Sequence, residues 1–277
     1  MTVPVAVTDA EGQTITDLTA EDFQIAEDGQ QEEIFKLVTA GESPLRLVLV
    51  FDLSGSIHPL FEFERTAASR FIEKVWKPGD TVSLITVSNK PEICIADSAT
   101  PEEVLSILSD LQPVESATAF FDSVVAAAEL QEKSTASSTR QATVIFSDGE
   151  DNRSDDVFVD AMASIRHSNT VVYAINPSGA SIRLNAISRK GQEWLAALAG
   201  KTGGTAFVSN NPSDLYDIYD RIAFELRAQY LLSYYSSNTY SDGSFRSISV
   251  TIPGKPDLHV RAREGYYAIG MMSEIRN

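Results

Sequence analysis

The pattern of apolar and polar residues changes twice along the chain. Val3, Val5 and Val7 occupy alternate positions near the start, and an Asp28-Gly29 pair separates two further alternating stretches. Period-two spacing with a DG turn predicts β-strands joined by a hairpin. The same alternation returns from Tyr230 onward. Both ends of the chain are therefore predicted to form antiparallel β-structure.

The middle of the chain alternates short apolar runs with longer amphipathic stretches. The apolar runs are residues 45–51, 81–87, 143–146, 171–175 and 206–208. Each is short and mostly apolar, as expected for a strand that is buried on both faces. Between the first two runs, Phe63, Ala67 and Phe71 are spaced by four residues, which predicts a helix with one face against a sheet. Strands that alternate with helices predict βαβ units around a mainly parallel sheet.

The simplest architecture joins the two β-rich ends into one small unit, because neither end alone has enough strands to bury a two-layer core. We expect an α/β domain at residues 43–228, Rossmann-like, with a doubly wound, mainly parallel sheet flanked by helices. An N-terminal β segment (residues 1–42) and a C-terminal β segment (residues 229–277) would pack together as a small β-sandwich. Two separate β appendages are the alternative. The 277 residues, of which 43% are hydrophobic, suffice for a large core and a smaller one.

Charge and composition exclude several classes of partner. The chain has 22 Lys and Arg against 39 Asp and Glu, so its formal net charge is -17. Such a charge repels nucleic acid and anionic membrane surfaces, and we expect neither as a partner. No stretch approaches the roughly 18–20 apolar residues of a membrane helix, so direct membrane insertion is not expected. Cys94 is the single cysteine and cannot form an internal disulfide.

Side chains with oxygen atoms gather in three predicted loops. These loops are DLSGS at residues 52–56, SAT at 116–118 and SDGEDN at 147–152. Loops at the carboxyl ends of strands meet at one edge of a doubly wound sheet, and ligands bind there. Carboxylates and hydroxyls, with no Cys and only His58 nearby, favour Mg²⁺, with Mn²⁺ or Ca²⁺ as alternatives, over zinc. The candidate metal ligands are Asp52, Ser54, Ser56, Thr118 and Asp148.

At these residues the sequence resembles the von Willebrand factor A domain family and its metal-ion-dependent adhesion site. The family pattern is Asp-x-Ser-x-Ser, a distant Thr and a distant Asp, and all five positions are present in order. The resemblance spans about residues 45–228. The terminal stretches DLTAEDFQIAEDGQ and REGYYA look like the VWFA-related type of exported bacterial proteins. One departure is Ser116-Ala117 before Thr118, where many relatives carry glycines.

Other acids near these loops have two interpretations each. Asp122, four residues after Thr118, either orients a metal ligand from behind the site or is a solvated helix residue. The acidic residues of the segment 150–156 either hold an additional Ca²⁺ or form a solvated, repulsive rim, and the rim is favoured.

The resemblance implies a module that recognises proteins and has no catalytic residues. In such a module the metal coordinates an Asp or Glu carboxylate of a protein partner, and an extracellular or periplasmic location is expected. One alternative is a structural component of an envelope or surface assembly. Another is a Mg²⁺-dependent phosphohydrolase with Asp52 as nucleophile. The sequence argues against it, because Ser54 stands where haloacid-dehalogenase-type phosphatases carry a second Asp and the three loops contain no lysine.

Overall fold

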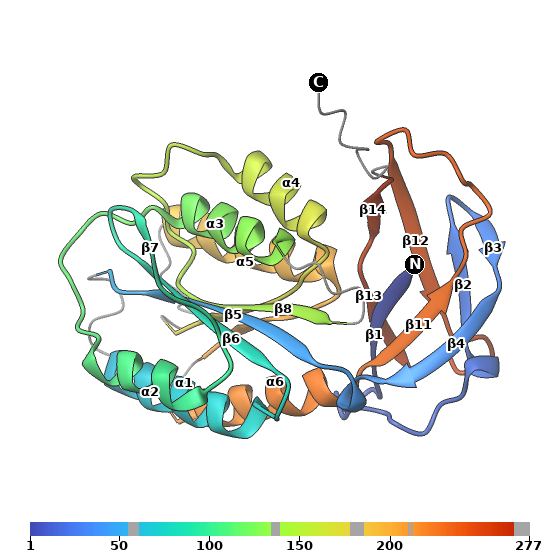
Figure 1. Ribbon diagram of the computed structural model, residues 1–277, viewed down its shortest axis with the longest axis horizontal. Coiled ribbons are helices and arrows are strands. Elements are labelled where there is room, and N and C mark those ends of the chain that lie inside the picture. The colour runs from blue at the N-terminus through green and yellow to red at the C-terminus, as the bar shows by residue number, and fades with distance from the viewer. Residues whose placement is uncertain (55–60, 134–138, 178–185, 210, 212, 269–277) are drawn as a thin grey trace.

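A six-stranded sheet forms the centre of the α/β part of the molecule, as the computed structural model in Figure 1 shows. The structure describes residues 1–54, 61–133, 139–177, 186–209, 211 and 213–268. The strands of the sheet are β5 (Leu45–Asp52), β6 (Thr81–Val87), β7 (Pro91–Ser98), β8 (Arg140–Phe146), β9 (Val171–Asn176) and β10 (Ala206–Val208). Their order is β10-β9-β8-β5-β6-β7. All neighbours run parallel except β6 and β7, which are antiparallel.

The apolar runs of the sequence predicted five of these six strands. The strands β6 and β10 have the predicted bounds, and β8 begins at Arg140 rather than at residue 143. The sequence did not predict β7. This strand lies at the edge of the sheet, and most of its residues are half-buried or exposed. It therefore lacks the continuous apolar run that marks a strand covered on both faces.

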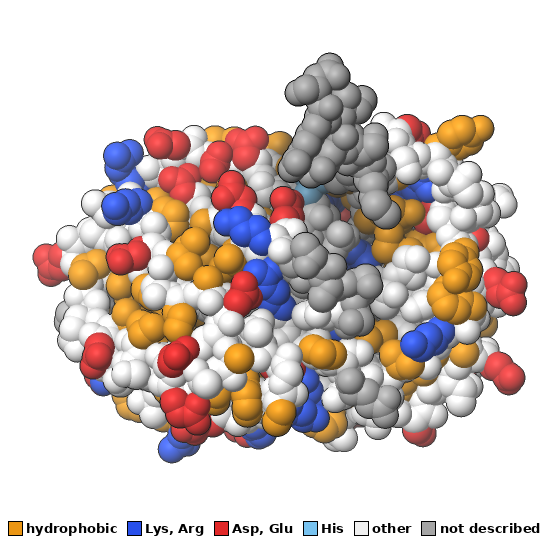
Figure 2. All heavy atoms as spheres, in the orientation of Figure 1, with side chains coloured by type: hydrophobic (Ala, Val, Ile, Leu, Met, Phe, Trp, Pro, Cys, Tyr) orange, Lys and Arg blue, Asp and Glu red, His pale blue; other side chains and the backbone are white. Residues whose placement is uncertain are grey.

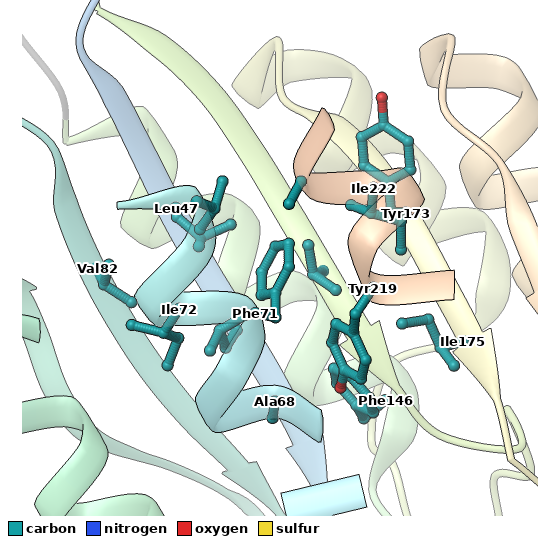
Figure 3. Packing of buried hydrophobic residues seen from close by; sticks show 14 of the residues in the cluster. Leu47, Ala68, Phe71, Ile72, Val82, Phe146, Tyr173, Ile175, Tyr219 and Ile222 are labelled. Carbon is teal, nitrogen blue, oxygen red and sulfur yellow. The ribbon is translucent and has the colours of Figure 1, made fainter. Parts of the chain in front are cut away.

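Helices cover both faces of the sheet, which confirms the predicted α/β fold class (Figure 1). One face packs against α1 (Phe61–Val75), α2 (Pro101–Asp110) and α6 (Asp214–Ala228). The other face packs against α3 (Phe120–Glu132), α4 (Phe158–Ser168) and α5 (Ala186–Thr202). Figure 3 shows part of the first cluster, in which Phe71 of α1 and Tyr219 of α6 lie close to Phe146 of β8.

The buried face of α1 differs from the predicted one. Phe63 was expected to face the sheet, but its side chain is 47% exposed. Phe61 and Glu64 are buried instead, together with Ala67 and Phe71. The prediction for Phe63 was wrong because apolar spacing alone cannot identify a charged residue that takes a core position.

Strands from both ends of the chain form a small β-sandwich beside the α/β part (Figure 1), as predicted. One sheet has the order β13 (His259–Ala262), β1 (Thr2–Thr8), β11 (Tyr230–Tyr234) and β4 (Ile34–Thr39). The other has the order β14 (Gly265–Tyr267), β12 (Phe245–Thr251), β2 (Gln24–Glu27) and β3 (Gln30–Glu32). Two short 3₁₀ helices, η1 (Ala20–Asp22) and η2 (Ala40–Glu42), flank these strands. One apolar cluster draws on both sheets. The domain limits at residues 42 and 228 stay predictions.

The sandwich and the α/β part share a buried polar contact at the end of α6. Only Gln229 separates α6 from β11. Glu225, in the last turn of α6, accepts a hydrogen bond from the Tyr173 hydroxyl at 2.5 Å and pairs with Arg261 of β13 at 2.5 Å. The Gln229 amide donates to the Tyr173 hydroxyl at 3.1 Å. These contacts connect the central sheet, α6 and the sandwich.

The surface carries its negative charge in many places. On the face shown in Figure 2, Asp and Glu side chains are scattered over the α/β part among basic and apolar groups. No helix in the described part of the chain has the length and apolar character needed to cross a membrane.

Candidate metal centre

The central sheet brings two of the three predicted loops to one edge. β5 and β8 are parallel neighbours, and Phe51 lies opposite Phe146 in their register. Asp52, the last residue of β5, and the Ser147-Asp148 pair after β8 therefore leave the sheet side by side. The chain continues from β5 to α1 on one face and from β8 to α4 on the other. Such a switch point between neighbouring strands is where doubly wound sheets bind ligands.

Asp52 is buried and held in a fixed position. Its Oδ1 accepts the backbone N–H of Ser54 at 2.8 Å, and its Oδ2 accepts the Ser147 hydroxyl at 2.6 Å. Burial raises the pKa of Asp52 to about 6 against the effect of these hydrogen bonds, and the charge of Asp148 adds to the rise. Asp52 is thus an acid whose ionised form would be favoured by a nearby positive charge.

Asp148 lies in a tight loop that packs closely against α5. Its Oδ1 accepts the backbone N–H of Glu150 at 3.0 Å. Gly149 follows with φ of +76°, and a Cβ added there would lie 2.5 Å from the carbonyl oxygen of Gly191 in α5. Conversely, a Cβ on Gly191 would lie 2.5 Å from the carbonyl oxygen of Asp148. Gly149 and Gly191 therefore let the loop approach α5 closely, and this contact fixes the position of Asp148 at the end of the sheet.

Thr118 reaches the same edge because Asn152 holds its loop. The Thr118 N–H donates to Asn152 Oδ1 at 2.8 Å, and the Asn152 N–H donates to the Thr118 carbonyl at 3.1 Å. Ser54, Thr118, Glu150 and Asn152 all line one cavity of about 440 Å³. Two predicted hydroxyl ligands thus face a common space.

The structure brings four of the five predicted ligands to one edge of the sheet. The residues at this edge, which we call the metal edge, are Asp52, Ser54, Thr118 and Asp148. Each of them is at most 4% exposed. Ser56 and the neighbouring His58 lie outside the described residues. The sequence did not single out Ser147 and Asn152, which position the predicted ligands. Their polar side chains within the loop SDGEDN were the only signal for them.

This donor set fits a hard divalent cation. The four residues offer carboxylate and hydroxyl oxygens, which Mg²⁺, Mn²⁺ and Ca²⁺ prefer. None of the ion pairs found among the described residues includes Asp52. A buried carboxylate without a basic partner is unfavourable unless another positive charge compensates it.

Comparison with known proteins places the chain in a family. The family model of the von Willebrand factor type A domain matches residues 47–221, which is more than half of the chain. The chain belongs to the von Willebrand factor type A (VWA) domain family. The match begins in β5 and ends in α6, so it contains all the described residues of the metal edge. No curated protein matches the sequence.

Several solved structures share the VWA fold at low sequence identity. Proximal thread matrix protein 1 from the mussel byssus, with a zinc-occupied MIDAS motif, has a TM-score of 0.56 and 16% identity, covering 71% of this chain and 48% of that chain. The pilus adhesin SpaC from Lactobacillus rhamnosus GG has a TM-score of 0.55 and 11% identity, covering 74% of this chain and 34% of that chain. The vWF domain of the type V pili tip protein Mfa5 from Porphyromonas gingivalis has a TM-score of 0.54 and 13% identity, covering 68% of this chain and 95% of that chain. The chain spans about half of the mussel protein and about a third of SpaC. Identities this low establish the fold alone.

Asp122 of the VWA domain contacts the acidic segment after Asn152. Its carboxylate accepts the backbone N–H groups of Asp156 at 3.0 Å and of Asp155 at 3.3 Å. Asp151 accepts the Phe121 N–H at 3.0 Å. The two acids therefore fasten the segment 150–156 to the start of α3. Both interpretations of Asp122 toward the metal stay predictions.

A second ion site has little support in this segment. Within the described residues, no group of three or more Asp, Glu, His or Cys side chains is arranged to hold a metal ion. Asp156 has a raised pKa because of partial burial and the surrounding charges of Asp122, Asp160 and Asp155. Mutual repulsion of this kind is typical of an acidic rim.

An apolar pocket adjoins the cavity of the metal edge. The pocket has a volume of about 330 Å³ and shares Glu150 and Asn152 with the metal-edge cavity. Its apolar side is formed by Ile187 and Trp194 of α5. The Trp194 ring is fixed by an edge contact with Phe121 at 4.7 Å between centroids. The site therefore combines oxygen donors with a preformed apolar surface.

Proposed function

We propose that this VWA domain is a metal-dependent protein-binding module. A divalent cation, Mg²⁺ or alternatively Mn²⁺ or Ca²⁺, is held by Asp52, Ser54, Ser56, Thr118 and Asp148 and coordinates an acidic side chain of a protein partner. The observation that carries the proposal is the buried Asp52, which belongs to no ion pair among the described residues. At the same edge of the sheet, Ser54 and Thr118 line a common cavity. A bound cation would supply positive charge locally, even though the net charge of the chain is -17.

Family membership and the neighbouring structures support this role. The neighbouring structures include a pilus adhesin, a pilus tip protein and a thread matrix protein whose MIDAS motif holds zinc. An adhesion function without catalysis agrees with these neighbours. They also support an extracellular or periplasmic location and the exported VWFA-related type.

The pocket beside the metal edge narrows the chemistry of the proposed partner. An acidic side chain that reaches the cation would place its neighbours near Glu150 and Asn152, which form the shared wall of the two cavities. The neighbouring pocket, whose lining includes Ile187, Trp194 and Lys190, suits a bulky apolar side chain. We therefore propose a partner segment in which an Asp or Glu lies close to an apolar residue.

Arrayed peptides test the proposal directly. Each peptide carries one Glu or Asp among apolar residues, and its matched control carries Gln or Asn at the same position. We expect wild type to bind acidic peptides in Mg²⁺ and to release them in EDTA, and Asp148→Asn to bind none. Equal binding of the amide peptides, or equal binding in EDTA, would contradict the proposal.

The same metal removal distinguishes recognition from a structural role. If the cation serves recognition, peptide binding disappears in EDTA while the melting temperature falls only by the free energy of ion binding. A collapse of the folded state in EDTA would favour the structural alternative instead.

A further inference from the structure

Glu64 is a buried acid behind the metal edge that the family motif does not include. It lies in the first turn of α1 and is completely shielded from solvent. Neither of its carboxylate oxygens has a hydrogen-bond partner among the described residues. Burial raises the pKa of Glu64 well above its usual value, and the charges of Asp52 and Asp148 raise it further. Phe61, one turn before Glu64 in α1, packs edge-on against Phe51 at 5.7 Å between ring centroids, and Phe51 directly precedes Asp52. Residues three apart share a helix face, so this packing places Glu64 close to the metal edge.

Away from the metal edge, the other buried acids among the described residues have partners. Glu27 pairs with Arg246 at 3.3 Å, and Glu225 pairs with Arg261 at 2.5 Å. Asp80 pairs with Arg227 and also accepts the backbone N–H of Leu45 at 2.8 Å. Glu32 accepts hydrogen bonds from the N–H and the hydroxyl of Ser237 instead. Glu64 has neither kind of partner among the described residues.

A second buried polar group lies on α6, where Tyr219 packs against Phe71 of α1 at 5.2 Å between ring centroids. Tyr219 of α6 is buried, and its hydroxyl has no hydrogen-bond partner among the described residues. Burial raises its pKa, and the charge of Glu64 contributes. Its ring stacks on Phe146 at 4.8 Å between centroids, two residues before Asp148, and Figure 3 shows the two rings together. Glu64 and Tyr219 therefore place a carboxyl and a hydroxyl near the metal edge, and neither has a hydrogen-bond partner among the described residues.

We propose that Glu64 is a buried negative charge behind the metal centre, which does not coordinate the cation but attracts it toward Asp52 and Asp148. This inference rests on the proposed function. A buried acid without a partner is unfavourable in the metal-free protein, and a divalent cation nearby compensates it. Glu64 is a positioning residue here, because its negative charge attracts the cation toward the ligands without coordinating it.

The charge of Glu64 behind the centre also changes the net charge that a partner meets. Two carboxylates neutralise a divalent cation, whereas three leave the centre with one net negative charge. Glu64 therefore strengthens cation binding and weakens the attraction of the loaded site for an acidic partner. Opposite effects of one residue on the two binding steps distinguish this role from a purely structural one.

Metal titration of matched variants tests the inference. The Mg²⁺ dissociation constant is measured by calorimetry at pH 7.5 for wild type, Glu64→Gln, Tyr219→Phe and Asp52→Asn. We expect Glu64→Gln to weaken Mg²⁺ binding by about tenfold or more, and Tyr219→Phe, which changes no charge, to leave it within about twofold. The metal-free melting temperature of Glu64→Gln should equal or exceed that of wild type. At saturating Mg²⁺, Glu64→Gln should bind the acidic peptides more tightly than wild type.

Each outcome has a defined meaning. Unchanged Mg²⁺ affinity in Glu64→Gln together with lost binding in Asp52→Asn would overturn the role of Glu64 and leave the metal site intact. Unchanged affinity in Asp52→Asn would overturn the proposed function itself. Glu64→Met, which is apolar and of similar length, replaces Glu64→Gln in the same titration if the amide variant does not fold, and the same affinity criterion applies to it.

Discussion

Glu27 in the β-sandwich and Asp52 in the VWA domain are both buried acids at the end of a strand, but their surroundings differ. Glu27 accepts hydrogen bonds from Tyr234 at 2.6 Å and Tyr266 at 3.0 Å, and Arg246 lies 3.3 Å away. Burial raises the pKa of Glu27, but the hydrogen bonds outweigh burial and hold it below its usual value. Burial dominates at Asp52, where the pKa rises to about 6. An acid with internal partners stabilises the fold, whereas an acid without a cation is suited to bind one.

The largest expected effect concerns the compensated acid. Glu27→Ala should lower the free energy of unfolding by about 3–5 kcal/mol, because it leaves the buried guanidinium of Arg246 without its partner. Urea unfolding followed by circular dichroism measures the change. Lys255→Ala is the control, since it breaks an exposed pair with Asp22 on the same sandwich. A loss for Glu27→Ala no larger than that of the control would remove the contrast between the two acids.

The uncompensated acid should behave in the opposite way. Asp52→Asn should weaken Mg²⁺ binding by more than about 100-fold. This exceeds the roughly 10- to 100-fold loss of affinity that is typical when a residue behind the metal ligands is removed. Its metal-free form should be at least as stable as wild type, because a buried charge disappears. Calorimetry and thermal unfolding in EDTA measure the two quantities. A metal-free Asp52→Asn protein much less stable than wild type would show that Asp52, like Glu27, mainly stabilises the fold.

The two acids should also respond oppositely to pH. The folded pKa of Asp52, about 6, lies above the unfolded value near 3.9, so the folded state binds this proton more tightly. The resulting stabilisation is fully present below about pH 4 and is lost as the pH rises through about 6, on the order of 2–3 kcal/mol in all. Glu27, whose folded pKa is lowered, stabilises the fold at higher pH and loses this contribution as the pH falls.

Melting temperatures between pH 4 and pH 7 in EDTA measure this dependence. The difference between Asp52→Asn and wild type isolates the contribution of Asp52. We expect Asp52→Asn to gain on wild type as the pH rises to about 6 and the difference to stay constant above it. A difference that does not vary with pH would show that Asp52 titrates normally in the folded protein.

A smaller effect is expected from the helix beneath the metal edge. Gly191→Ala places a Cβ 2.5 Å from the carbonyl oxygen of Asp148, so the loop must move. Overpacking of this kind costs about 1–3 kcal/mol, and Mg²⁺ affinity should fall with the displaced ligand. Gly200→Ala in the same helix is the control, because nothing lies within 4 Å of its added Cβ. It should stabilise the protein by up to about 1 kcal/mol and leave Mg²⁺ affinity unchanged. Equal affinities in both variants would show that the contact at Gly191 does not set the position of Asp148.

The sequence predicted the buried strands of the central sheet better than its edge strand. The strands before Asp52 and Asp148 were predictable because strands buried on both faces carry continuous apolar runs. The ends of parallel strands then bring their loops together, so the oxygen-rich loops could be combined into one site. The edge strand β7 could not be predicted, because its residues are largely half-buried or exposed.

Glu64 shows why part of the site was inaccessible from sequence. An amphipathic pattern assigns a glutamate in the first turn of a helix to solvent and a nearby phenylalanine to the core. The structure reverses the two, since Glu64 is buried and Phe63 is exposed. A charged residue in a core position breaks the local rule, and only its three-dimensional surroundings reveal the break.

The pairing of β4 with β11 has a mechanical consequence. The chain enters the VWA domain after β4 and returns through β11, and these strands are antiparallel neighbours in which Thr39 lies opposite Tyr230. A pulling force applied between β1 and β14 is therefore carried by the hydrogen-bonded strands of the sandwich. The sandwich bridges the entrance and exit of the VWA domain, so the metal edge bears load only after β4 and β11 have separated.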